Sequence, residues 1–160
     1  MASIPPVIRH MLICDDVQRG SETRPKLNVI GLVHRIRAKP GQQFPIQHTG
    51  LCVYLVLTGG SGTGQIQVRI TDAESDVGLV ETPIHEFEHP PDRHAISGLA
   101  IRIAACIFPH PGLYWVEFHH DGNMLRREPV SVSEHERVAK SPHRGRRNTP
   151  ERTRTPSLGR

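Results

Sequence analysis

The segment His85-Glu86-Phe87-Glu88-His89 has the residue types of a zinc hydrolase site. It fits HExxH, in which two histidines bind zinc and the glutamate acts as general base, and also the inverted HxxEH. Such histidines share a face of a helix, whereas in a strand they lie about 13 Å apart. Pro83 and Pro90-Pro91 bracket the segment and disfavour a helix. We therefore expect an exposed loop or edge segment, with a metal-dependent hydrolase as an alternative.

The glycine-rich run Gly59-Gly60-Ser61-Gly62-Thr63-Gly64 could cradle a phosphate through its backbone N–H groups. It lacks the GK[ST] ending of a phosphate-binding loop, and it leads into a strand pattern instead of a helix. We expect a flexible hairpin loop, which could still contact a partner.

Aspartates and histidines near strand ends raise the question of a metal site. Asp15 and Asp16 with Asp121 could bind calcium only if the fold brought several of their oxygens together. Aspartates at strand ends usually organise turns, and we expect that role here. His119 and His120 should point to opposite faces of one strand, so they do not form a metal pair.

The three cysteines lie far apart, each inside an apolar run: Cys14, Cys52 and Cys106. Their odd number and their surroundings predict buried free thiols in a reducing cytoplasm. No serine lies in a GxSxG elbow, and no cysteine has an activating neighbour, because Asp15 would raise the pKa of the Cys14 thiol. We find no motif for nucleophilic catalysis or for a cofactor.

The net charge of +4 comes from the end of the chain. Of the 20 Lys and Arg and the 16 Asp and Glu, residues 134–160 hold eight and three, which leaves twelve and thirteen in residues 1–133. Residues 134–160 have few bulky apolar side chains, so we expect a disordered basic tail. Its arginines could bind nucleic-acid phosphates without sequence preference, the candidate contacts being Arg144, Arg146, Arg147, Arg152 and Arg154.

The elements that must position these residues are strands. Apolar residues recur with period two or in short runs between Gly, Pro and Asp clusters, and no window has a helical stripe. The start of the chain lacks a signal-peptide pattern, and the run from Leu51 to Leu57 is too short for a membrane helix. We expect strands at about 7–14, 26–37, 50–58, 65–72, 77–82, 97–107, 113–120 and 124–132.

The last two strands should form a hairpin, since Asp121-Gly122 supplies the positive φ angles of a two-residue turn. Pro111-Gly112 breaks the chain just before it. Four of the seven aromatic residues should add bulk to the core here: Phe108, Tyr114, Trp115 and Phe118. The sequence predicts one all-β, antiparallel sandwich over residues 5–133, followed by the tail over 134–160.

Several segments carry a common pattern: Ile13-Cys14-Asp15-Asp16-Val17, Lys26-Leu27-Asn28-Val29-Ile30-Gly31, Phe44-Pro45, Pro111-Gly112-Leu113-Tyr114 and Asp121-Gly122. Together they resemble a bacterial family of short all-β domains of unknown function, over roughly residues 7–132. The resemblance implies an immunoglobulin-like or C2-like sandwich in a cytoplasmic bacterial protein, and no catalytic or binding residue. This chain departs from the pattern in a polar insertion, Gln18 to Pro25, and in its basic tail.

The sequence therefore predicts a non-catalytic module that acts through contacts with a protein partner of unknown identity. Weak nucleic-acid association through the tail is the second hypothesis, from a different class. We expect a cytoplasmic protein without membrane association, cofactor or metal.

Overall fold

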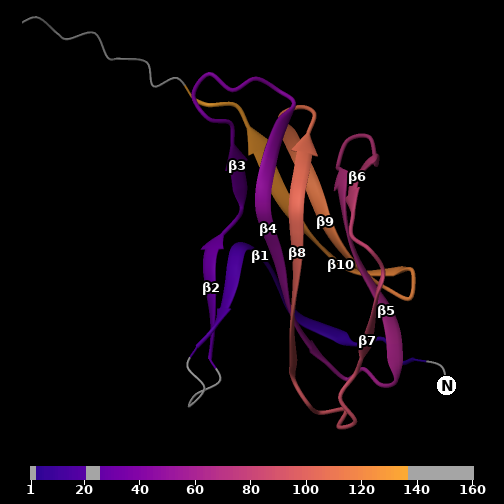
Figure 1. The fold of residues 1–160 in the computed structure, drawn as a ribbon. Helices are drawn as coiled ribbons and strands as arrows, with labels where there is room; N and C mark the ends of the chain where they lie inside the picture. Colours follow the sequence, from indigo (N-terminus) through magenta and orange to yellow (C-terminus); the bar gives the residue numbers. More distant parts are fainter. Residues whose placement is uncertain (1–2, 21–25, 137–160) are drawn as a thin grey trace, which may run out of the picture.

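The computed structural model describes residues 3–20 and 26–136, which form ten strands in two packed sheets (Figure 1). Within these residues there is no helix, and so none that could cross a membrane. The strands are β1 (Val7–Arg19), β2 (Leu27–Leu32), β3 (Arg35–Arg37), β4 (Ile46–Thr58), β5 (Thr63–Asp72), β6 (Gly78–Glu81), β7 (His85–Glu88), β8 (Ser97–Phe108), β9 (Gly112–His120) and β10 (Asn123–Ser133).

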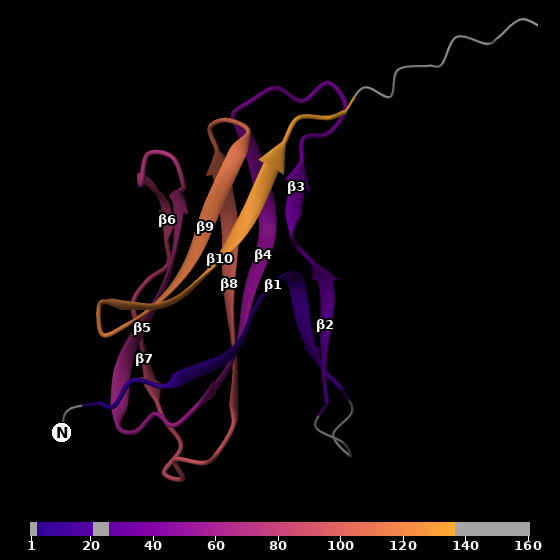
Figure 2. The ribbon, with the colours of Figure 1, turned by 180° about the vertical axis from the view of Figure 1, so that it is seen from behind.

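The two sheets have the strand orders β2-β1-β4-β8 and β3-β10-β9-β5-β6, and β7 also pairs with β5. Strands β4 and β8 face the viewer in Figure 1, and β9 and β10 face the viewer in Figure 2. All pairs are antiparallel except β3 with β10. The predicted all-β sandwich is confirmed, while the division of the chain near residue 133 stays a prediction.

The single strand expected over 26–37 is wrong, because the chain changes sheets within it. β2 pairs with β1, whereas β3 pairs with β10 in the other sheet. Gly31 has a φ of +63°, and a Cβ there would lie 2.1 Å from Oδ2 of Asp15. The backbone therefore bends within β2 at a position that only glycine fills without strain, and it passes to the other sheet after Leu32, which still pairs with Cys14. The first strand is also longer than expected, since β1 continues to Arg19.

The core lies between the sheets and is mostly aliphatic, as the alternation in β4 and β5 requires. Of the four aromatic residues expected in it, Phe108, Tyr114 and Phe118 are fully buried. Trp115 is the exception, since it is only half-buried and lies under the Arg127 guanidinium, 4.2 Å from the ring centroid. Because residues 114 and 115 face opposite sides of β9, only one of them can enter the core.

The connection from β8 to β9 crosses from one sheet to the other and is fastened by Tyr114. Its hydroxyl donates a hydrogen bond of 2.6 Å to the His110 carbonyl, and its ring packs edge-on against Phe108 at 4.8 Å. His110 also contacts the Asp72 carboxylate at 2.8 Å. A tyrosine hydroxyl bonded in this way to the backbone a few residues upstream is called a tyrosine corner.

Substituting Tyr114→Phe should therefore destabilise the domain by about 1–2 kcal/mol, because it leaves the His110 carbonyl without this donor. Urea denaturation monitored by circular dichroism measures the loss. Tyr54→Phe is the matched control, since the described residues give its hydroxyl no hydrogen bond, and a change below about 0.5 kcal/mol is expected. Equal losses in both variants would contradict the role of the corner.

Candidate functional site

Two buried histidines meet where the chain passes from β4 to β5. His89 follows β7 and His120 ends β9, and their Nε2 atoms lie 3.1 Å apart, so that one ring donates a hydrogen bond to the other. The two residues are only 5% and 1% exposed. The fold therefore joins the last residue of the HExxH pattern to the second residue of the His119-His120 pair.

Asp121 completes this group from the turn after β9. Its Oδ2 atom lies 3.3 Å from Nδ1 of His120 and also accepts a hydrogen bond from the Ser3 hydroxyl. Its Oδ1 atom accepts a 2.8 Å hydrogen bond from the Gln65 backbone N–H. These hydrogen bonds lower the pKa of the Asp121 carboxyl, so the carboxylate holds the turn and the second histidine in place.

The glycine-rich run makes room for the two rings. A Cβ at residue 60 would lie 2.4 Å from Nδ1 of His89, and one at residue 64 would lie 2.2 Å from Nε2 of His120. The run is not the flexible hairpin loop expected from the sequence, because β4 and β5 belong to different sheets. Its Ser61 also pairs with Ile4.

The group lacks the arrangement that acyl-transfer catalysis needs. In a catalytic triad the imidazole lies between the nucleophile and the carboxylate, whereas here the Ser3 hydroxyl contacts Asp121 and His120 contacts His89. Nor do the described residues contain a cluster of three or more His, Cys, Asp or Glu placed to hold a metal ion. Burial lowers the pKa of His89, and the neighbouring His120 lowers it further. This ring therefore stays neutral inside the fold.

Gly64→Ala should destabilise the domain by about 1–3 kcal/mol, because the new methyl group collides with a ring that cannot leave its buried position. Thermal unfolding is the measurement. Gly78→Ala is the matched control, since a Cβ at residue 78 meets nothing within 4 Å. If both substitutions have the same effect, the glycine run is not shaped by the histidine pair.

The histidine pair should also make the domain sensitive to acid. The pKa of His89 is lower in the folded chain than its ordinary value of about 6.5, so the unfolded chain binds more protons between these two values. The stability from the neutral pair is present above pH 6.5 and is lost as the pH falls through this window. We expect His89→Gln to cost about 1–3 kcal/mol at pH 8 and less at pH 5.

Urea denaturation of wild type and His89→Gln at pH 8 and pH 5 checks this expectation. The pKa of His110 is raised by hydrogen bonds to the Pro111 carbonyl and to Asp72. The stability that His110 contributes therefore depends on pH in the opposite direction, since it is lost as the pH rises. His110 is present in both proteins, and its effect cancels in the difference between them. A difference that is the same at both pH values would rule out the role of His89.

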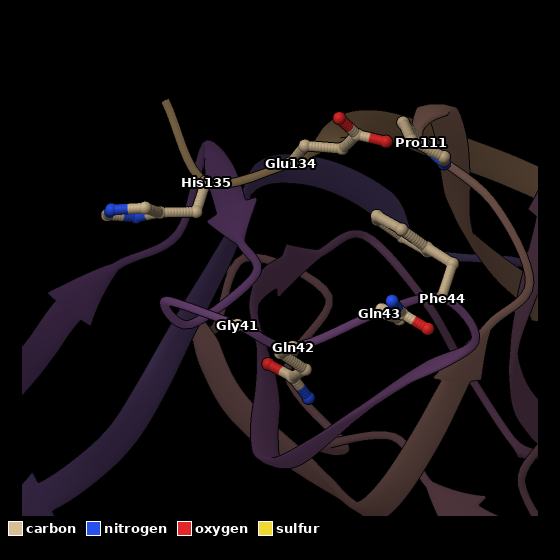
Figure 3. A pocket seen from close by; sticks show the side chains of 7 residues that line it. All are labelled: Gly41, Gln42, Gln43, Phe44, Pro111, Glu134 and His135. Carbon is tan, nitrogen blue, oxygen red and sulfur yellow. The ribbon is translucent and has the colours of Figure 1, made fainter. Parts of the chain in front are cut away.

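A hollow of about 350 Å³ lies at the other end of the sandwich, between the β3–β4 connection and the end of β10 (Figure 3). Its lining offers two glutamine amides, the Phe44 ring and the Glu134 carboxylate. The His135 ring points away from the other labelled side chains in Figure 3. The hollow therefore brings no base to a nucleophile.

A second hollow, of about 500 Å³, lies on the outer face of the first sheet, between the far end of the β1–β2 hairpin and strands β4 and β8. We call it the hairpin groove. Its lining is mainly apolar with two arginines, and comprises Val17, Arg19, Leu27, Tyr54, Gly98, Leu99, Ala100 and Arg102.

Two contacts build the hairpin groove. Arg102 donates hydrogen bonds to the Asp16 carboxylate at 2.8 Å and to the Val17 carbonyl at 3.1 Å, which holds the hairpin against β8. A Cβ at residue 98 would lie 2.8 Å from the Tyr54 hydroxyl oxygen, so Tyr54 lies close against the backbone of β8. Because residue 98 is glycine, the Tyr54 side chain has room to lie across β8 and to form part of the groove lining.

The remaining candidate residues from the sequence lie outside these two hollows and the histidine pair, or take part only in local contacts. The zincin-like segment is edge strand β7, as expected, but His89 is buried instead of exposed. Asp16 pairs with Arg102, and the described residues place no metal-binding cluster around it or Asp121. His119 and His120 point to opposite faces, His119 contacting Glu117 at 3.0 Å, but both are buried.

The three cysteines are free and buried, as expected. Cys14 and Cys52, distant in sequence, lie opposite each other on β1 and β4. Burial raises the pKa of Cys14 and of Cys106 to about 12, so neither thiol is activated at neutral pH. The tail arginines named as nucleic-acid contacts lie outside the described residues, and their role stays a prediction: Arg144, Arg146, Arg147, Arg152 and Arg154.

Comparison with known proteins gives a family but no activity. A family model described as "Family of unknown function (DUF6941)" matches residues 9–133, which run from β1 to the end of β10. No curated protein gives a significant match. The family expected from the sequence, a group of all-β domains of unknown function, is thereby confirmed. The chain belongs to the DUF6941 family.

Proposed function

We propose that this domain is a non-catalytic β-sandwich module that acts through protein contacts, and that its binding surface is the hairpin groove. The groups that resemble catalytic parts hold the fold together, since the His89–His120 pair is buried and the Asp121 carboxylate accepts hydrogen bonds from Ser3 and Gln65. The groove instead offers accessible apolar surface next to the Arg19 side chain, which is the composition of a recognition site.

The groove favours an extended segment that presents an apolar side chain next to a carboxylate. Leu27 is 42% exposed and forms one wall, so an apolar side chain of the partner would cover it. Arg19 lines the same groove, and no ion pair of its side chain is found within residues 3–20 and 26–136. A carboxylate of the partner would supply that ion pair.

We further propose an immunoglobulin-like topology and a cytoplasmic location in a bacterium. The orders β1-β4-β8 and β10-β9-β5 match strands A-B-E and G-F-C of immunoglobulin domains, and the tyrosine corner supports the same assignment. Free buried thiols at Cys14, Cys52 and Cys106 are consistent with a reducing compartment.

The test is capture of partner proteins from a lysate of the source cells by the full chain and by two substituted forms. Leu27→Glu places a charge in the groove beside Leu99 and should reduce retention of a specific partner at least about tenfold. Leu32→Glu is the matched control, because Leu32 lies on the same strand, is 55% exposed and does not line the groove. It should retain the partner.

Equal retention by all three proteins would show that the groove is not the binding surface. A turnover that is abolished by substituting His85, His89 or Asp15 would overturn the proposal that the domain is non-catalytic.

A further inference from the structure

We propose that Cys14 and Cys52 are a modification site, at which an oxidant forms a reversible disulfide that locks the β1–β2 hairpin to β4. Both thiols are free in this structure. Because the hairpin forms one wall of the hairpin groove, the bond would regulate the proposed binding surface, and to that extent it rests on the proposed function.

The two cysteines face each other across neighbouring antiparallel strands. Cys14 on β1 pairs directly with Cys52 on β4, and Sγ of Cys14 lies 3.6 Å from the Cys52 carbonyl oxygen. Directly opposite residues have Cβ atoms about 4.5–5.5 Å apart, whereas a disulfide needs about 3.5–4.5 Å. A shift of about 1 Å therefore closes the pair without any change in strand register.

Both thiols are fully buried, but they lie outside the main core. Their strand neighbours Ile13 and Val53 belong to that core, so the cysteines point to the opposite, outer face of the first sheet. There they form a second cluster with Val17, against which Tyr54 packs. Because Val17 and Tyr54 also line the hairpin groove, the thiol pair lies next to the groove, behind side chains that form its lining.

The thiol pair stands where the hairpin leaves β4. It is the last pair between β1 and β4, whereas the pairing of β1 with β2 continues to Arg19. Beyond it the hairpin is held to the sheet by the packing of Val17 and by the bonds of Arg102 to Asp16 and to the Val17 carbonyl. The Arg102–Asp16 ion pair is exposed and therefore a weak restraint. Local opening of the hairpin gives an oxidant access to the thiols.

Opening the hairpin changes the surroundings of Cys52 in favour of its thiolate. Arg102 is paired with Cys52 on neighbouring strand β8 and stays beside it, whereas Asp16 moves away with the hairpin. Burial is the main cause of the raised pKa of Cys52, and it is lost on opening, while the Arg102 guanidinium continues to lower this pKa. Cys52 is therefore the thiol that reacts first.

Hydrogen peroxide supplies the oxidising equivalents. The Cys52 thiolate attacks one peroxide oxygen, the O–O bond breaks, and hydroxide leaves a sulfenic acid on Cys52. The Cys14 thiolate then attacks this sulfur, so that the S–S bond forms and a second hydroxide leaves. The two thiols have lost two electrons and two protons, and the peroxide has become two water molecules. A dithiol reductant reverses the bond by exchange.

The bond is tested on the folded, full-length chain with hydrogen peroxide as the probe. Wild type should lose two of its three free thiols and about 2 Da of mass, and peptide mapping should join Cys14 to Cys52. Cys52→Ala should form no disulfide within the chain. Cys106→Ala is the matched control, because it also removes a buried thiol and should form the same bond as wild type.

The route through the open hairpin is tested by the rate of disulfide formation. Asp16→Asn removes the exposed ion pair and should raise this rate about threefold. Glu128→Gln removes the exposed Arg126–Glu128 ion pair of the other sheet and should leave the rate unchanged. Amide hydrogen exchange over β2 should slow once the disulfide has formed, and should return to its first rate after reduction with dithiothreitol.

Three intact thiols in peroxide-treated wild type, or a disulfide that involves Cys106 or a second chain, would overturn the proposal. So would equal rates for Asp16→Asn and Glu128→Gln, or hydrogen exchange over β2 that the disulfide leaves unchanged. Partner capture by Leu27→Glu tests the groove alone. Unchanged capture by that variant would remove the groove as the binding surface and would leave the mass, rate and exchange results of the disulfide as they are.

Discussion

The structure depends on satisfying the polar groups at the points where the chain crosses between its two sheets. A strand within a sheet has its backbone groups paired, but a crossing leaves donors and acceptors at the edge of an apolar core, where an unpaired group is costly. Two of these crossings are fastened by buried side chains. Tyr114 fastens the passage from β8 to β9, and the His89–His120 pair with Asp121 fills the end of the core beside the passage from β4 to β5.

This requirement explains why the residues that resemble catalytic parts are used to hold the fold together. The glycine run, the second histidine of the zincin-like segment and the aspartate of the hairpin turn meet in one place, but their hydrogen-bonding groups face one another. Nearly all the surface of the two imidazoles is covered by protein, so a substrate cannot reach them. The same residue types at an open cleft would be candidates for a catalytic site.

The sequence predicts the strands well because the period-two alternation and the turn residues act locally. It does not predict where the chain changes sheets, as residues 26–37 show, since the apolar run Val29-Ile30-Gly31-Leu32-Val33 continues past the end of β2 without a turn signal of more than one glycine. The meeting of His89 and His120 depends on pairing between distant strands. The sequence does contain one indication that His120 is buried. In a strand, His120 shares its face of β9 with Tyr114 and Phe118, so it must point into the core with them.

β8 supplies part of the hairpin groove to which we assign binding, since Gly98, Ala100 and Arg102 belong to its lining. Arg102 donates hydrogen bonds to the Asp16 carboxylate and to the Val17 carbonyl, which holds the β1–β2 hairpin against β8 and neutralises the charge of the arginine. The hairpin is therefore required both for the shape of the groove and for its charge. A change in the hairpin that releases Arg102 would widen the groove and expose an unpaired cation in it, so one side chain controls both properties of this surface.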